Sequence, residues 1–332
     1  WRSGCTMDEI REYLTALDLV VNCPMETTTG NNEPTDYVLF TQPGMRYCQV
    51  QALVHVLMKD SIFQGFSEHE KRLATEKILE EVRGRMMEDI VLLWLIGVKI
   101  VLVHGGGRLA TSVAASLGIE SRIVGGRRIT DGQMLRVVTM VYGGLVNKSI
   151  VAGLQARGVK AIGLTGADGD LIRSHRRPPK RVRTDGGEQT VDFGFVGDVD
   201  KVDAGLLASL IEGGAVPVIA PLTHDGEGHI LNTNADTIAS SVAQALAVCY
   251  EVTLTFCFEK RGVLRDADDD GSVIPLITEG QASRLVEEGI ISGGMIPKME
   301  NAFSAIRSGV RQVVITHSED IAGLHGTTIR EK

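Results

Sequence analysis

Three consecutive glycines follow directly on a short β-branched run, and this junction constrains the fold more than any other feature. Residues 99–104 read Lys-Ile-Val-Leu-Val-His, then come Gly105, Gly106 and Gly107, and an alanine-rich stretch over 109–117 has helical periodicity. The order strand, glycine turn, helix aims backbone N–H groups and a helix N-terminus at an anion. A tight turn without a ligand would explain one glycine, but three in succession favour a loop whose bare backbone a carboxylate or phosphate can approach.

Two well-known phosphate-binding loops are excluded by their spacing. A Walker A loop requires Lys followed by Ser or Thr after its last glycine, and Arg108 occupies that position. The dinucleotide-binding fingerprint requires Gly-x-Gly-x-x-Gly, whereas Gly163, Gly166 and Gly169 are spaced three apart. The sequence therefore predicts an anion-binding α/β protein outside both classes.

Charge and cysteine content narrow the class of protein further. The 332 residues carry a formal net charge of −8, which argues against a nucleic-acid partner. The basic run over 173–183 has no interleaved aromatic side chains and is interpreted as a solvated hairpin or loop. Five scattered cysteines without a Cys-x-x-Cys pair predict reduced thiols and no zinc site. We see no secretory signal and no apolar stretch of the roughly 20 residues that a membrane span needs, so we expect a cytoplasmic protein.

Strand and helix patterns alternate along the rest of the chain. Apolar β-branched runs predict strands over 161–164, 216–220, 252–258, 273–277 and 310–316. Helical periodicity predicts helices over 67–96, 109–117, 132–156, 203–213, 237–246 and 279–288, and a last helix that contains Lys298 and ends at Ser308. Residues 192–202 are turn-rich and are expected to form a hairpin with the basic run, and 221–228 a loop. This alternation predicts a three-layer αβα sandwich with a mainly parallel sheet and ligands at the carboxyl ends of its strands.

Four motifs occur in the order typical of one family. They are His104-Gly-Gly-Gly, Gly126-Arg-Arg-Ile-Thr, Asn232-Thr-Asn-Ala-Asp236 and Gly294-Met-Ile-Pro-Lys298. From about Met87 onwards the chain thereby resembles the N-acetylglutamate kinase branch of the amino-acid kinase family. The sequence around Tyr142 and around Ala220 most resembles the form of this family found in Bacteroidetes-type bacteria. The resemblance implies transfer of a phosphoryl group from ATP with Mg²⁺ to the side-chain carboxylate of N-acetyl-L-glutamate, in arginine biosynthesis, by a homodimer.

The same resemblance implies roles for individual residues. It assigns acceptor binding to Gly106, Gly107, Arg128 and Asn232, catalysis to Lys298 and Asp236, and nucleotide binding to Lys260, Gly262, Val263, Leu264, Ile290, Ile291 and Ser292. The attacking carboxylate is already an anion, so such a site needs positioning and positive charge rather than a general base. Taken singly, Arg128 could be a surface ion pair, Asp236 a helix cap and Lys298 a solvated helix residue. The ordered set of motifs favours the catalytic interpretation.

The first 85 residues depart from this family. Its members open with a strand carrying Lys-x-Gly-Gly, and that motif is absent from residues 1–98, where Lys59 and Gly65 are the nearest substitutes. The sheet would lose a strand unless residues 37–40 or another segment fills its place. Because one phosphate-facing lysine is missing, activity is in doubt. A second hypothesis is therefore a catalytically impaired member that binds acylglutamate or nucleotide as a regulatory subunit, and a third is a kinase for N-succinylglutamate or another carboxylate.

Three segments are expected from these patterns. Residues 1–85 form an atypical, mostly helical segment, 86–248 an acylglutamate-binding lobe and 249–332 an ATP-binding lobe. The sequence favours a small-molecule substrate over any macromolecular partner other than a second copy of the chain.

Overall fold

The computed structural model describes residues 47–53, 86–95, 97–124, 127–184, 187–258, 260–266, 268–292, 295–318, 320–321 and 325–331. The chain divides into two compact units, Trp1–Met45 and Arg46–Lys332, and every described residue belongs to the second. The predictions made for Lys59, Gly65, residues 37–40 and the helix over 67–85 lie outside the described residues.

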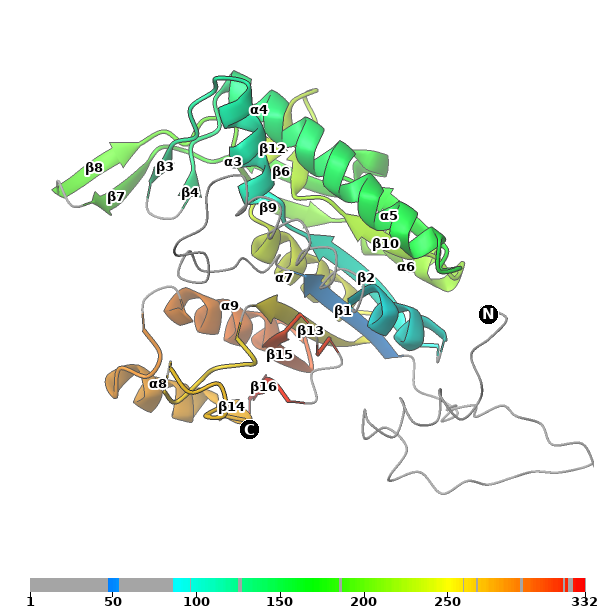
Figure 1. Cartoon of the computed structure of the whole chain (residues 1–332), viewed down its shortest axis with the longest axis vertical. Helices are drawn as coiled ribbons and strands as arrows, with labels where there is room; N and C mark the ends of the chain where they lie inside the picture. The colour runs from blue at the N-terminus through cyan, green and yellow to red at the C-terminus, as the bar shows by residue number, and fades with distance from the viewer. Residues whose placement is uncertain are drawn as a thin grey trace, which may run out of the picture. The chain divides into compact units, whose positions relative to one another are not determined.

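An eight-stranded sheet forms the centre of the second unit (Figure 1), in the order β14-β16-β15-β13-β1-β2-β10-β5. Its strands are β1 (Tyr47–Leu53), β2 (Lys99–His104), β5 (Ala161–Leu164), β10 (Val216–Ile219), β13 (Glu251–Phe258), β14 (Leu276–Thr278), β15 (Gln312–His317) and β16 (Thr327–Arg330). All neighbours pair in parallel except β15 with β16. The predicted, mainly parallel sheet is confirmed.

Helices cover both faces of this sheet. They are residues 86–95, α3 (Gly107–Ser116), α4 (Gly132–Val138), the π-helix η2 (Thr139–Val146), α5 (Asn147–Gln155), α6 (Ala204–Glu212), α7 (Ala235–Leu246), α8 (Glu279–Glu287) and α9 (Met295–Arg307). Successive side chains of a strand point to opposite faces. Accordingly, Val101 and Val103 of β2 belong to one core cluster with α6 and α7, whereas Ile100 and Leu102 belong to another with Ile90 and α5. This is the predicted three-layer sandwich.

The strand missing from the family pattern is supplied by β1. It lies between β13 and β2 and is parallel to both, with Leu53 opposite His104 at the carboxyl end of β2. Another segment than residues 37–40 therefore fills the gap. The carboxyl ends of β1, β2 and β13 consequently lie along one edge of the sheet, where α/β proteins of this kind bind ligands.

Smaller sheets are formed by strands within residues 123–232. Strands β6 (Ile172–Arg176), β9 (Gly197–Val202), β11 (Leu222–His224) and β12 (Ile230–Asn232) form a four-stranded sheet, and two hairpins are formed by β3 (Ile123–Val124) with β4 (Arg127–Arg128) and by β7 (Lys180–Thr184) with β8 (Gly187–Val191). Pairing of β6 with β9 confirms the hairpin predicted for the basic run. The loop predicted over 221–228 is wrong for its first part, which is β11, because Leu222 and Thr223 are buried between β12 and β6.

The predicted helix over 132–156 is continuous but not uniform, since η2 separates α4 from α5. The segment Gly132–Gln155 is long and apolar enough to cross a membrane by length and composition alone, which the sequence analysis did not anticipate. In this fold Met134, Val137 and Val141 belong to a core cluster with Ala110 of α3, so the segment packs as part of a helical layer.

Candidate active site

The site lies at the carboxyl edge of the central sheet. The glycine turn follows His104, the last residue of β2, and Phe258 is the last residue of β13. The Nζ atom of Lys298, in α9, lies 3.4 Å from the centroid of the Phe258 ring. Only β1 separates β2 from β13, which places the two strands roughly 10 Å apart, or two strand spacings. The glycine turn and Lys298 therefore belong to one edge and one region of the sheet.

Gly106 shapes the turn after β2. Its φ of +152° is a conformation that side chains disfavour, and a Cβ there would lie 2.9 Å from Cδ1 of Tyr142. Its carbonyl accepts from the N–H of Ala110, and α3 begins at Gly107, two residues before the predicted start. No residue of the first turn of α3 is acidic. The N-terminus of α3 thus carries the partial positive charge that suits an anion.

Arg128 lies against this turn. Its Nη2 donates to the carbonyl of Gly107 and to Oγ1 of Thr111, both at 2.8 Å, and its Nη1 donates to the Ser121 hydroxyl. Arg128 thus contacts the glycine turn, and within the described residues its guanidinium forms no ion pair. A carboxylate could make a two-pronged contact with this guanidinium only by displacing some of these protein oxygens.

Asn232 joins the end of β12 to the segment after β4. Its Nδ2 donates to Oγ1 of Thr130 at 2.9 Å, and its backbone N–H donates to the carbonyl of Phe195. Thr130 is buried, and the cap of α4 is Asp131, whose side chain accepts from the N–H groups of Gln133 and Met134. Asn232 is therefore held at the edge of the region that Arg128 occupies.

Asp236 and Lys298 interact electrostatically at the first turn of α7. The cap of α7 is Asn234, which accepts from the Thr237 N–H at 3.0 Å, so Asp236 is not the cap. Oδ1 of Asp236 is buried and has no hydrogen-bond partner among the residues that the structure describes. Burial raises the pKa of Asp236, opposed by the charges of Lys298 and Arg127. Burial lowers the pKa of Lys298, opposed by Asp236.

The residues predicted for nucleotide binding lie in two loops, after β13 and after α8. In the loop after β13, Lys260 donates to the 65% exposed carboxylate of Asp270 at 3.0 Å. Gly262 leaves room for no side chain, since a Cβ would lie 2.6 Å from Oγ1 of Thr327, which accepts from the Val263 N–H. Leu264 forms an isolated β-bridge with Val273. Ile291 is buried and Ile290 packs against the core cluster that contains it, whereas Ser292 is exposed.

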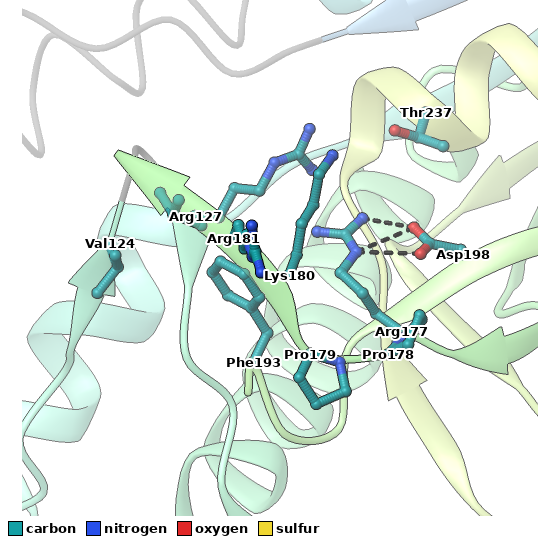
Figure 2. A pocket seen from close by; sticks show the side chains of 11 residues that line it. Val124, Arg127, Arg177, Pro178, Pro179, Lys180, Arg181, Phe193, Asp198 and Thr237 are labelled. Carbon is teal, nitrogen blue, oxygen red and sulfur yellow. Dashed lines mark hydrogen bonds and ion pairs between the residues drawn. The ribbon is translucent and has the colours of Figure 1, made fainter. Parts of the chain in front are cut away.

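Arg127 is the residue that sequence reasoning missed. It and Arg128 are consecutive in β4, so their side chains point to opposite sides. Arg127 lines a cavity of about 590 Å³ with residues of the basic run and with Thr237, next to Asp236 (Figure 2). The basic run is not wholly solvated as predicted, because the Arg177 side chain is 11% exposed and paired with Asp198. The sequence signal that could have pointed to Arg127 is the pair of consecutive arginines, because neighbouring residues of a strand point to opposite sides.

One group of potential metal ligands occurs on the loop between β11 and β12. Ligand atoms of Asp225, Glu227 and His229 lie within 4.8 Å of one another, and Glu227 and His229 are exposed. The Asp225 carboxylate accepts hydrogen bonds from the backbone N–H groups of Glu227 and His229 and from the His229 ring. These bonds lower the pKa of Asp225 to about 2. These hydrogen bonds stabilise the loop and explain why the three side chains lie close together.

Comparison with known proteins identifies the family of this chain. Residues 74–317 match the amino acid kinase family, to which the chain belongs. Within it the chain is similar to the acetylglutamate kinases of Bacteroides thetaiotaomicron (63% identical over 231 residues, 70% of this chain and 86% of that protein) and Methanopyrus kandleri (44% over 230 residues, 69% and 90%).

Solved structures show the same fold. N-acetylglutamate synthase from Neisseria gonorrhoeae, complexed with coenzyme A and N-acetyl-glutamate, aligns with a TM-score of 0.64 and 21% identity over 86% of this chain and 60% of that one. Carbamate kinase from Giardia lamblia bound to AMP-PNP aligns with a TM-score of 0.56 and 14% identity over 86% and 99%. At these identities the likeness concerns the fold alone.

Proposed function

We propose that this chain phosphorylates the side-chain carboxylate of N-acetyl-L-glutamate with ATP; its relatives carry the name acetylglutamate kinase. The observation that carries the proposal is the arrangement at one sheet edge: Arg128 against the glycine turn, and Lys298 with Asp236 two strand spacings away. The reacting carboxylate attacks as an anion, so the chain has to supply positioning and positive charge.

The acceptor is held by the half of the site that follows β2 and β4. Backbone N–H groups of Gly106 and Gly107 contact the reacting carboxylate, Arg128 binds the α-carboxylate, and Asn232 binds the acyl group or the acceptor backbone. The N-terminus of α3 adds favourable potential for an anion. The segment 86–248 is accordingly the acceptor lobe of the proposal.

The nucleotide is held by the segment 249–332. The Lys298 ammonium suits phosphate oxygens because it is half-buried and lies over the ring of Phe258. Within the described residues, the carboxylate of Asp236 is the one negative charge that raises its pKa. ATP supplies the phosphoryl group and brings Mg²⁺ on its phosphates. Asp236 orients Lys298, and Lys260, Gly262, Val263, Leu264, Ile290, Ile291 and Ser292 form the adenosine side, with the buried ones acting through their backbone.

An assay of the purified chain tests the proposal. ATP-dependent formation of N-acetylglutamyl phosphate is trapped with hydroxylamine, beside Lys298→Ala and the control Lys201→Ala, which removes an exposed lysine of β9. Loss of one positive group at the transferring phosphoryl should lower kcat by about 10²- to 10³-fold, and Lys201→Ala should leave it unchanged. Turnover no faster than Lys298→Ala, with calorimetric binding of acceptor or ATP retained, would instead identify an impaired, regulatory member.

The acceptor class is tested in the same assay. N-acetyl-L-glutamate should be the fastest acceptor beside N-succinyl-L-glutamate and L-aspartate, since Arg128 and Asn232 provide for an α-carboxylate and an acyl group. Faster phosphorylation of aspartate would reassign the chain to another branch of the family.

The proposal includes a cytoplasmic homodimer. Met140 and Leu145 of η2 are more than half exposed, and Ile162 of the edge strand β5 is 37% exposed. Such apolar side chains on one helix and a neighbouring strand edge are typical of an interface between subunits. Light scattering should give twice the chain mass for the wild type and a single chain mass for Met140→Lys with Leu145→Lys.

A further inference from the structure

Four positive side chains line the cavity that reaches Thr237, the residue after Asp236. Arg127, Arg177, Lys180 and Arg181 face it together with one carboxylate, that of Asp198. Figure 2 shows Arg127 and Lys180 extending into the space between β7 and the first turn of α7, where Thr237 lies. The chain as a whole is acidic. A volume of about 590 Å³ is that of a small-molecule pocket.

The positive charges in this pocket are only partly compensated. Arg177 is neutralised by Asp198, to which its Nε donates at 3.1 Å, and its guanidinium lies 5.8 Å from the centroid of Phe193. Within the described part of the chain, Arg127, Lys180 and Arg181 form no ion pair. Burial and the charge of Arg177 lower the pKa of Arg127, and the carboxylates of Asp198 and Asp236 oppose this shift. An anion would relieve that repulsion.

Apolar side chains complete the wall. Phe193 is buried beneath Arg177, and Pro178, Pro179 and Val182 line the same space. The combination of cations with apolar surface suits an organic anion whose charged oxygens meet Arg127 and Lys180.

We propose that Arg127, Lys180 and Arg177 form a binding site for an anionic group of a small molecule, a carboxylate or a phosphate, distinct from the anion site at Arg128. The two arginines of β4 bind different anionic groups, because their side chains point to opposite sides of the strand. Arg128 is bound to Gly107 and Thr111 of α3, whereas Arg127 faces the cavity that Thr237 lines. The site does not depend on kinase activity.

Calorimetry at low ionic strength tests the site directly, with inorganic phosphate and glutarate as probes of the wild-type chain. Arg127→Ala and Lys180→Ala should each weaken binding about 10-fold, because each removes a charge-assisted hydrogen bond. The matched control Arg136→Ala removes an exposed arginine of α4 that is not part of the cavity, and it should bind as the wild type does. Absence of probe binding in the wild type, or an equal loss in Arg136→Ala, would overturn the proposal.

Asp198→Asn tests the charge balance with a side chain of the same shape. It removes the one carboxylate of the pocket and frees Arg177, so both probes should bind more tightly; weaker binding in a variant that unfolds like the wild type would contradict the site. Kinetics then identify the source of the anion. Probes that raise only the KM of the acceptor indicate a subsite for the acceptor, probes that raise only the KM of ATP indicate a nucleotide phosphate, and probes that change neither indicate a separate small anion.

Discussion

Gly106 holds the glycine turn in a conformation that a larger residue strains. Its φ of +152° and the 2.9 Å approach of Tyr142 to a built Cβ predict that Gly106→Ala destabilises the chain, by about 2 kcal/mol in the free energy of unfolding. Gly132→Ala is the control, because nothing lies within 4 Å of its Cβ at the start of α4. Urea unfolding should show a lower midpoint for the first variant and an equal or higher one for the second.

The carboxylate of Asp236 raises the pKa of Lys298, against the effect of burial. Burial lowers the pKa of Lys298 below its ordinary 10.5, and the carboxylate of Asp236 opposes that shift. The ammonium needed for phosphoryl transfer loses its proton as the pH rises through the pKa of Lys298 in the folded chain. We therefore expect kcat to fall on the alkaline side (the alkaline limb) at a pH below the pKa of a free lysine. In Asp236→Asn this pKa falls further and the limb should move to lower pH. Asp200→Asn, at an exposed carboxylate of β9, should leave the limb in place; an unmoved limb in Asp236→Asn would contradict the coupling.

At the scale of single residues, the sequence did not predict which side chains contact one another. The bonds from Arg128 to the glycine turn were not expected from the motifs, and Arg127 became visible only once β4 had placed it on the opposite side of the strand, facing a hairpin more than 50 residues later. Burial is likewise a property of the assembled fold. The pairing of Lys260 with Asp270, ten residues later, depends on how the loop between them folds and is not visible in the pattern over 260–264.

The first turn of α7 places Asp236, and its cap is the element that fixes this turn. Asn234 accepts from the Thr237 N–H at 3.0 Å, so Asn234→Ala should destabilise the chain by about 1 kcal/mol and Asn234→Ser by much less. Thermal unfolding measures both variants. Equal midpoints for the Ala and Ser variants would show that packing of α7 against the sheet, rather than its cap, holds this turn.

Elements with a strong local pattern were predicted nearly to the residue. Ala161–Leu164 is β5 as expected, and α8 and α9 differ from their predicted ends by a residue or so. Failures concern elements that depend on distant partners. Strand β16 pairs with β14 and β15, and β11 pairs with β6, some 50 residues away. The π-helical register of η2 also has no marker in its apolar sequence.

The whole molecule is organised around a strand that lies outside the region matching the family. Residues 74–317 match the amino acid kinase family, yet β1 precedes them and occupies the centre of the sheet, paired over six residues with β13 and over six with β2. The sequence predicted that a strand was missing but could not identify its replacement, because parallel pairing leaves no local signature. Topology therefore requires β1 even though the motif of the family's opening strand is absent.

Two truncations test whether β1 is required by the fold. Residues 46–332 form a unit of their own, so a chain beginning at residue 46 should unfold cooperatively at the midpoint of the full chain. A chain beginning at residue 54 lacks β1 and leaves β2 and β13 without their shared partner, exposing the backbone groups of two strands at the centre of a sheet. We expect this shorter chain to aggregate or to lose its cooperative transition. Calorimetry and light scattering compare the two, and equal stability would mean that β2 and β13 close on each other without β1.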